Sequence, residues 1–206
     1  MDAIIFDVDG TLWDSTDVVA VAYNRTIEEH TDLPVRVTAD DLKQLFGKPM
    51  DVIFATLLPT LTYEEQCALG EKCFSEEHKE LEKTPGTVYE GLEETLKVLS
   101  EKYPLYIVSN CQKGYIELFF RKTGLGRYFK GHLCFGETGT SKGQTMLQLM
   151  RRNNLKAPVY VGDTQGDADA SKEAGVPFVF AEYGFGNVAH PDYKISCLRD
   201  LTDLFD

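Results

Sequence analysis

The sequence is organised around the stretch Ile4-Ile5-Phe6-Asp7-Val8-Asp9-Gly10-Thr11. Its short apolar run is typical of a strand that is buried on both faces, as in a parallel sheet. Side chains two residues apart on an extended backbone point the same way, so Asp7 and Asp9 should project together from the end of this strand. Two carboxylates held together repel unless a cation or a proton intervenes. The stretch therefore indicates a chemical site or, more simply, an acidic turn that ends a strand.

The composition narrows the class of protein. A chain of 206 residues suffices for one large domain, or for a core domain with a smaller insertion. The formal net charge of −12 argues against a general nucleic-acid-binding protein, which would present a basic face. The five cysteines are odd in number and lack metal-ligand spacing, which favours reduced thiols. With no signal peptide and no long apolar run, we expect a cytoplasmic protein that does not bind a membrane.

From residue 15 to residue 84 the pattern is helical, and no convincing strand interrupts it. Helices should begin near residues 14–16, at Thr38 and at Thr62, where Thr62-Tyr63-Glu64-Glu65 has the form of a capping box. A further apolar stretch covers residues 52–58. Trp13, just before this segment, could line the entrance of a site or pack beneath the helical segment, and packing is favoured. Four helices are therefore predicted directly after the first strand.

From residue 85 onward, apolar strands alternate with amphipathic helices. Strands are expected at residues 105–108, 132–135, 158–161, 176–180 and 193–197. This alternation predicts an α/β fold with a doubly wound, Rossmann-like parallel sheet and right-handed crossovers. The predicted domains are an α/β core, residues 1–14 and 85–206, and a small all-helical domain, residues 15–84, inserted after the first strand.

Polar residues gather where the predicted strands end. Asp7 and Asp9 follow the first strand, Ser109 and Asn110 follow the second, and Asp163 follows the strand at residues 158–161. In doubly wound sheets, ligands bind beyond the carboxyl ends of the strands, at the point where the strand order reverses. The sequence therefore predicts that these residues share one site.

Four separated pieces of the chain occur in a specific order. They are Asp7-x-Asp9-Gly10-Thr11, Ser109-Asn110, Lys142 and Gly162-Asp163-Thr164-x-x-Asp167. This set resembles the four motifs of the haloacid dehalogenase-type (HAD) hydrolase superfamily, and within it the phosphoglycolate-phosphatase-like branch. The resemblance covers essentially the whole chain, and it implies that the helical insertion is the cap domain of that family.

The resemblance implies a Mg²⁺-dependent phosphatase that works through an aspartyl-phosphate. Asp7 is the implied nucleophile, and Asp9 is the implied general acid and base. The implied metal ligands are Asp7, the backbone carbonyl of Asp9, and Asp163, with Asp167 either a further ligand or an acid beside them. This all-oxygen set is the kind that Mg²⁺ prefers.

The remaining candidate residues would bind the substrate. Ser109 and Asn110 can donate hydrogen bonds to phosphoryl oxygens, and Lys142 supplies a cation for the phosphate and for catalysis. Thr11 would contact the phosphate or orient the turn. Lys48, in a loop that resembles a cap loop of related enzymes, would contact a substrate carboxylate or second phosphate, or would simply be solvated. The expected substrate is a small phosphorylated metabolite such as 2-phosphoglycolate, and the protein is expected to be a monomer or a weak homodimer.

Two other functions remain open at this point. A sugar phosphomutase of the β-phosphoglucomutase type would use the same four motifs and return the phosphate to a sugar. A non-enzymatic binding protein on the same scaffold would be expected to lose part of the acidic set, whereas every expected acid is present. Phosphate ester hydrolysis is therefore the leading hypothesis, and the motifs do not identify the physiological substrate.

Overall fold

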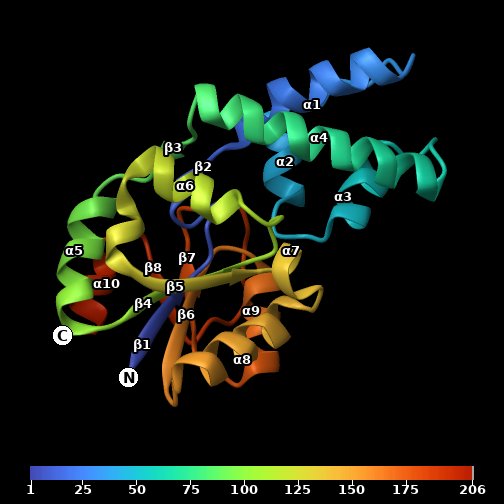
Figure 1. Cartoon of the computed structure of the whole chain (residues 1–206). Helices are drawn as coiled ribbons and strands as arrows, with labels where there is room; N and C mark the ends of the chain where they lie inside the picture. The colour runs from blue at the N-terminus through green and yellow to red at the C-terminus, as the bar shows by residue number, and fades with distance from the viewer. Residues whose placement is uncertain (206) are drawn as a thin grey trace. The chain divides into compact units, whose positions relative to one another are not determined.

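The computed structural model describes residues 1–205 and divides into two compact units (Figure 1). The core unit contains Met1–Trp13 and the chain from Val88 onward, and the helical unit contains Asp14–Thr87. Two very short strands, β2 (Trp13–Asp14) and β3 (Thr87–Val88), pair where the chain passes from one unit to the other. The first strand of the protein thus belongs to the core, although a whole helical unit separates it in sequence from the rest.

The core unit is built on a parallel sheet. Within residues 1–205 this sheet has six strands in the order β5-β4-β1-β6-β7-β8, and each neighbouring pair is parallel. The strands are β1 (Ala3–Phe6), β4 (Leu105–Ser109), β5 (Phe129–Cys134), β6 (Pro158–Gly162), β7 (Phe178–Ala181) and β8 (Tyr193–Ile195). β1 lies in the middle, with Ile5 opposite Tyr106 on one side and Tyr160 on the other. The predicted doubly wound α/β fold is confirmed.

Helices fill the crossovers between these strands. They are α5 (Leu92–Lys102), α6 (Tyr115–Thr123), the 3₁₀ turn η1 (Leu125–Tyr128), α7 (Phe135–Thr138), α8 (Lys142–Asn153) and α9 (Gln165–Ala174). A further helix, α10 (Asp200–Leu204), follows the last strand. Helices α8 and α9 pack against each other and against the sheet (Figure 1). Ile5, Tyr160 and Phe180 on the sheet and Met146 and Leu149 on α8 form part of the apolar core there. Because β1 is covered in this way, an uninterrupted apolar run is the sequence that suits it.

Several predicted boundaries differ from the structure, among them the start of β5 at residue 129 rather than 132 and the end of β8 at residue 195 rather than 197. Phe135 begins helix α7 rather than ending β5. Helix α9 begins at residue 165, before the expected residue 168, because the Thr164 hydroxyl caps its first turn. β7 begins at residue 178 rather than 176, because Val176 still donates its backbone N–H to Ser171 O at the end of α9, at 2.9 Å.

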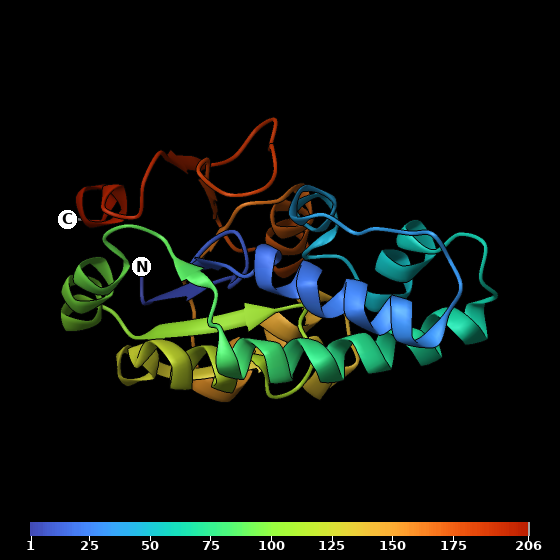
Figure 2. The ribbon, with the colours of Figure 1, turned by 90° about the horizontal axis from the view of Figure 1, so that it is seen from above.

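The helical unit contains all four helices expected from the sequence. They are α1 (Thr16–His30), α2 (Ala39–Leu45), α3 (Met50–Leu57) and α4 (Tyr63–Lys83). Helices α1 and α4 lie side by side along their lengths (Figures 1 and 2). Between them the Tyr23 hydroxyl donates to Glu77 Oε2 at 2.9 Å, and both side chains are buried. Across the described residues, no helix combines the length and the apolar character needed to cross a membrane.

The capping box predicted at the start of α4 is confirmed. The Thr62 hydroxyl accepts a hydrogen bond from the Glu65 backbone N–H at 3.3 Å, and Glu65 Oε2 accepts from the Thr62 N–H at 2.8 Å. These bonds satisfy two backbone donors that the first helical turn would otherwise leave without partners. A four-residue sequence signature thus sets the first residue of the longest helix in the helical unit.

Replacing Thr62 with alanine should lower the free energy of unfolding by about 1 kcal/mol, because α4 loses its side-chain cap. Thr62→Ser keeps the hydroxyl and should retain most of that stability. Urea unfolding followed by circular dichroism measures both variants against the native chain. Equal stability of all three proteins would contradict the capping role of Thr62.

Candidate active site

The site lies at the carboxyl ends of the three central strands. Asp7 directly follows β1, Ser109 is the last residue of β4, and Asp163 directly follows β6. The strand order reverses between β1 and β6, because the chain adds β4 and β5 on one side of β1 before it crosses to β6 on the other. The Asp7 backbone N–H donates to Val161 O at 2.9 Å and holds these two strand ends together. Residues far apart in sequence therefore meet at the position where doubly wound folds bind ligands.

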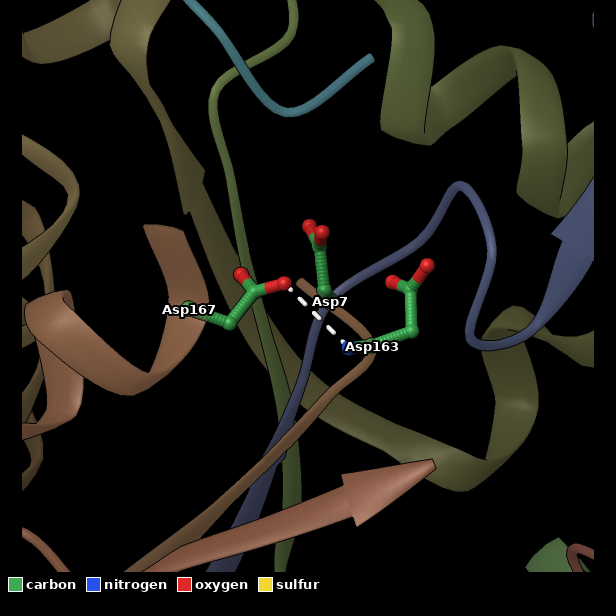
Figure 3. A group of neighbouring side chains, drawn as sticks. All are labelled: Asp7, Asp163 and Asp167. Carbon is green, nitrogen blue, oxygen red and sulfur yellow. Dashed lines mark hydrogen bonds between the residues drawn. The ribbon is translucent and has the colours of Figure 1, made fainter. Parts of the chain in front are cut away.

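Three carboxyl groups converge at this point. Asp7, Asp163 and Asp167 each offer an oxygen within 4.8 Å of the others. Their exposed fractions are 2%, 0% and 0%. Figure 3 shows that Asp7 comes from the end of β1, Asp163 from the loop after β6, and Asp167 from the first turn of α9. These three acids were predicted to share one site, and all three belong to the core unit.

One lysine lies against the acids. Lys142 is the first residue of α8 and is only 5% exposed. Its ammonium nitrogen lies 3.0 Å from Asp7 Oδ2 and 2.6 Å from Asp167 Oδ1. The predicted cation of the site is therefore in place, and it bridges two of the three carboxylates.

A single cation does not balance three buried carboxylates. Burial raises the pKa of Asp7 to about 6, with Lys142 opposing and Asp167 reinforcing the increase. Burial, together with the charges of Asp167 and Asp7, raises the pKa of Asp163 well above its usual range. For Asp167, burial acts in the same direction, but Lys142 and Thr164 outweigh it and lower the pKa. Asp7 and Asp163 are thus the carboxyl groups whose ionisation is disfavoured, and an additional cation would stabilise their charged forms.

Asp167 is fully engaged by donors from the protein. Its Oδ1 accepts from Lys142 and from the Tyr160 hydroxyl, the latter at 3.2 Å. Its Oδ2 accepts from the Asp163 N–H at 3.2 Å and from the N–H and hydroxyl of Thr164 at 3.0 and 2.7 Å. Since each carboxylate oxygen has about two lone pairs, this carboxylate has little capacity for another partner. Asp167 therefore holds Lys142 and the loop after β6 in position.

A glycine-containing loop after β7 contacts Asp163, and this contact was not expected from the sequence. The Phe185 N–H donates to Asp163 Oδ2 at 2.7 Å, while the Thr11 hydroxyl donates to Oδ1 at 3.1 Å. Thr11 thus orients an acid of the site rather than standing free. Gly184 has no room for a side chain, because a Cβ there would lie 2.2 Å from Asp163 Cβ and 2.4 Å from Gly10 O. The Gly-x-Gly spacing of residues 184–186, directly after a strand end, is the signal that could have revealed this loop.

Asp9 lies two residues after Asp7 in sequence and is held by aromatic residues. Its Oδ1 accepts from Trp13 Nε1 at 3.1 Å and from the Tyr115 hydroxyl at 2.6 Å. Trp13 is fully buried and packs edge-to-face against Tyr115 and Phe119 of α6. The hydrogen bonds of both aromatic residues to Asp9 were not predicted.

The other predicted substrate-binding residues divide between the two units. Ser109 is buried at the end of β4, and Asn110 beside it is half-buried. Lys48 belongs to the helical unit, where it is exposed and follows Gly47, whose φ of +84° requires glycine or a similarly permissive residue. The core unit therefore gathers every predicted site residue except Lys48.

Known proteins share this sequence pattern. The chain is 29% identical to a phosphoglycolate phosphatase of Aquifex aeolicus over 215 residues, which cover 100% of this chain and 97% of that protein. It is 26% identical to the pyrophosphatase PpaX of Bacillus velezensis over 211 residues, which cover 98% of this chain and 95% of that protein. Both of these relatives are phosphatases by name.

A solved structure and a family model agree with these two relatives. A haloacid dehalogenase-like hydrolase of Streptococcus pneumoniae has the same fold, with a TM-score of 0.87 at 23% identity and coverage of 100% of this chain and 99% of that one. The family model described as haloacid dehalogenase-like hydrolase matches residues 4–181. The resemblance inferred from the four motifs is confirmed, and the chain belongs to the haloacid dehalogenase-like hydrolase family.

Proposed function

We propose that this hydrolase is a Mg²⁺-dependent phosphomonoester phosphatase that acts on a small phosphorylated metabolite through an aspartyl-phosphate on Asp7. The observation that carries the proposal is the buried cluster of Asp7, Asp163 and Asp167 with Lys142 at the reversal of the strand order. Phosphoryl transfer depends mainly on positioning and on neutralising charge, and this cluster supplies both.

The donor set suits a hard divalent cation. Asp7 Oδ1 is buried and has no hydrogen-bond partner among the described residues. Asp7, Asp163 and the backbone carbonyl of Asp9 would hold Mg²⁺, which prefers oxygen ligands and keeps several waters. Asp167, whose oxygens are already occupied by protein donors, would position Lys142 and Asp163 instead. When bound, the ion would neutralise the charge of the acids and of the substrate phosphate.

Asp7 is the proposed nucleophile. One of its oxygens would attack phosphorus, the bond from phosphorus to the leaving oxygen would break, and the phosphoryl group would remain on Asp7. Lys142 would fix the orientation of Asp7 through its contact with Oδ2. Ser109 and Asn110 would donate hydrogen bonds to the phosphoryl oxygens as charge develops on them.

Asp9 is the proposed general acid and base. In the first step its proton would pass to the oxygen of the leaving alcohol. In the second step Asp9 would take a proton from the water that attacks phosphorus, and the bond between phosphorus and Asp7 would break to release inorganic phosphate. Each cycle thus consumes one water and returns both carboxyl groups to their starting states.

The helical unit would select the substrate. We propose that residues 15–84 form the cap of this enzyme and that residues 1–14 and 85–206 form its catalytic core. Lys48 would contact an anionic group of the substrate from the cap. Because named relatives are a phosphoglycolate phosphatase and a pyrophosphatase, 2-phosphoglycolate and pyrophosphate are the first substrates to test.

Phosphate release from a panel of phosphorylated metabolites tests the proposal, with 2-phosphoglycolate, pyrophosphate and hexose phosphates included. We expect turnover that requires Mg²⁺ and stops with a chelator. Asp7→Asn should lower kcat by at least about 10³-fold, because the nucleophile is lost. Asp169→Asn, which changes an exposed acid on α9, is the matched control and should retain activity. Isomerisation of a hexose phosphate without phosphate release would favour a phosphomutase, and substantial activity of pure Asp7→Asn would exclude Asp7 as the nucleophile.

The stability of the metal-free protein should depend on pH through the same acids. The folded pKa of Asp7 is about 6, above the ordinary value of 3.8, so the native state holds a proton that the unfolded chain has lost in this interval. Stability should therefore fall as the pH rises from about 4 to above 6. At pH 7.5 with a chelator, Asp7→Asn should melt a few degrees above the native protein, roughly the effect of 1–2 kcal/mol. The difference should shrink towards pH 5, and a difference that is independent of pH would contradict this assignment.

A further inference from the structure

Two buried donors converge on the same oxygen of Asp9. Trp13 Nε1 lies 3.1 Å from Asp9 Oδ1, and the Tyr115 hydroxyl lies 2.6 Å from it. Trp13 is 0% exposed and Tyr115 is 2% exposed, whereas Asp9 itself is half-buried. Hydrogen bonds to an ionised carboxylate are stronger than those between neutral groups. Both contacts lie within the core unit.

The turn after β1 brings the indole to Asp9. The Trp13 N–H donates to Val8 O at 3.3 Å, and Trp13 O accepts from the Gly10 N–H at 3.0 Å. Asp9 and Trp13 also form an isolated β-bridge. The chain thus makes a tight loop between Asp9 and Trp13, and the φ of +78° at Gly10 makes this loop feasible.

The side chains of the two donors, Trp13 and Tyr115, also pack against each other. The rings of Trp13 and Tyr115 meet edge-to-face with centroids 5.9 Å apart, and Trp13 meets Phe119 in the same way at 5.1 Å. Tyr115 is the first residue of α6, directly after Gly114, so its backbone is set by the start of a helix. Because both side chains are buried and packed against other rings, little further entropy is lost when they hold Asp9 in one orientation.

We propose that Trp13 and Tyr115 are positioning residues that assign different roles to the two oxygens of Asp9. A carboxylate oxygen has about two lone pairs, and Oδ1 uses them to accept from Trp13 and Tyr115. Oδ2 is therefore the oxygen that carries the transferred proton. This inference rests on the function proposed above for Asp9 as general acid and base.

The arrangement assists both steps of the reaction. When the proton leaves Oδ2 for the leaving oxygen, negative charge develops on the Asp9 carboxylate, and the two donors on Oδ1 stabilise it. When the attacking water returns a proton to Oδ2, the same donors keep that oxygen directed at the water. Substrates with poor leaving groups, such as alkyl phosphates, depend most on this proton and should be the most sensitive to its misplacement.

Tyr115→Phe tests the inference because it removes the hydroxyl and keeps the ring. We expect kcat for an alkyl phosphate to fall roughly tenfold, the value of one hydrogen bond to a charged group, while KM changes little. The loss with para-nitrophenyl phosphate should be smaller, because its leaving group needs less proton assistance. Trp13→Phe should act in the same direction. Tyr103→Phe is the matched control, since the Tyr103 hydroxyl donates to Phe205 O elsewhere in the core unit.

A double-mutant cycle separates positioning from a general structural role. In an Asp9→Asn background, Tyr115→Phe should cause no further loss of turnover of para-nitrophenyl phosphate, because the carboxyl proton that Tyr115 helps to position is already absent. Trp13 is the one tryptophan of the chain, so its fluorescence gives a readout besides activity. Asp9→Ala should shift the emission of Trp13, whereas Asp169→Ala should not. An unchanged emission spectrum in Asp9→Ala would contradict the contact.

The outcomes distinguish this inference from the proposed function. If the native protein hydrolyses phosphate esters and Tyr115→Phe behaves like Tyr103→Phe, the positioning role is overturned and the phosphatase assignment stands. Equal losses for alkyl and aryl phosphates, or additive losses in the double mutant, would also overturn it. If the native protein hydrolyses no phosphate ester, the proposed function fails first and this inference fails with it.

Discussion

The structure depends on the burial of three carboxylates beside a single lysine at the ends of β1 and β6. Asp7, Asp163 and Asp167 are almost fully removed from solvent, and Lys142 is the cation that contacts two of them in the described part of the core unit. Such an arrangement costs stability unless protons or a cation complete it. A fold optimised for stability alone would replace these acids, so their retention points to chemistry.

The surrounding residues keep this costly cluster rigid. Donors from Thr164 and Lys142 hold Asp167, while Thr11 and the backbone of Phe185 hold Asp163. Backbones approach so closely at Gly184 that no side chain would fit. These contacts come from four separate segments of the chain, and the parallel sheet brings them to one edge. The rigidity of the site is therefore a property of the sheet topology rather than of any one loop.

Local patterns predicted much of this architecture. The apolar run before Asp7 predicted a buried strand, and the Thr-x-x-Glu pattern at Thr62 predicted the start of a helix. Both depend on residues close together in sequence, and both predictions were confirmed. The meeting of Asp7 with Asp163 was predictable because parallel strand ends share an edge. The contacts of Trp13 and Tyr115 with Asp9 were not predictable, because they depend on where α6 begins and on the tight turn after β1. Side-chain hydrogen bonds between elements leave no periodic trace in a single sequence.

The central position of β1 has a consequence for how the chain acquires its structure. The strand is synthesised before its partners, which are β4 on one side and β6 on the other, with Ala3 opposite Pro158. During translation, residues 3–6 must wait for most of the chain to emerge before the middle of the sheet is complete. Such long-range pairing slows folding and leaves an apolar segment exposed in the nascent protein. Because Asp163 and Asp167 follow β6, the three acids can come together only after that strand has been synthesised, so the shorter nascent chain does not bear the electrostatic cost of the finished site.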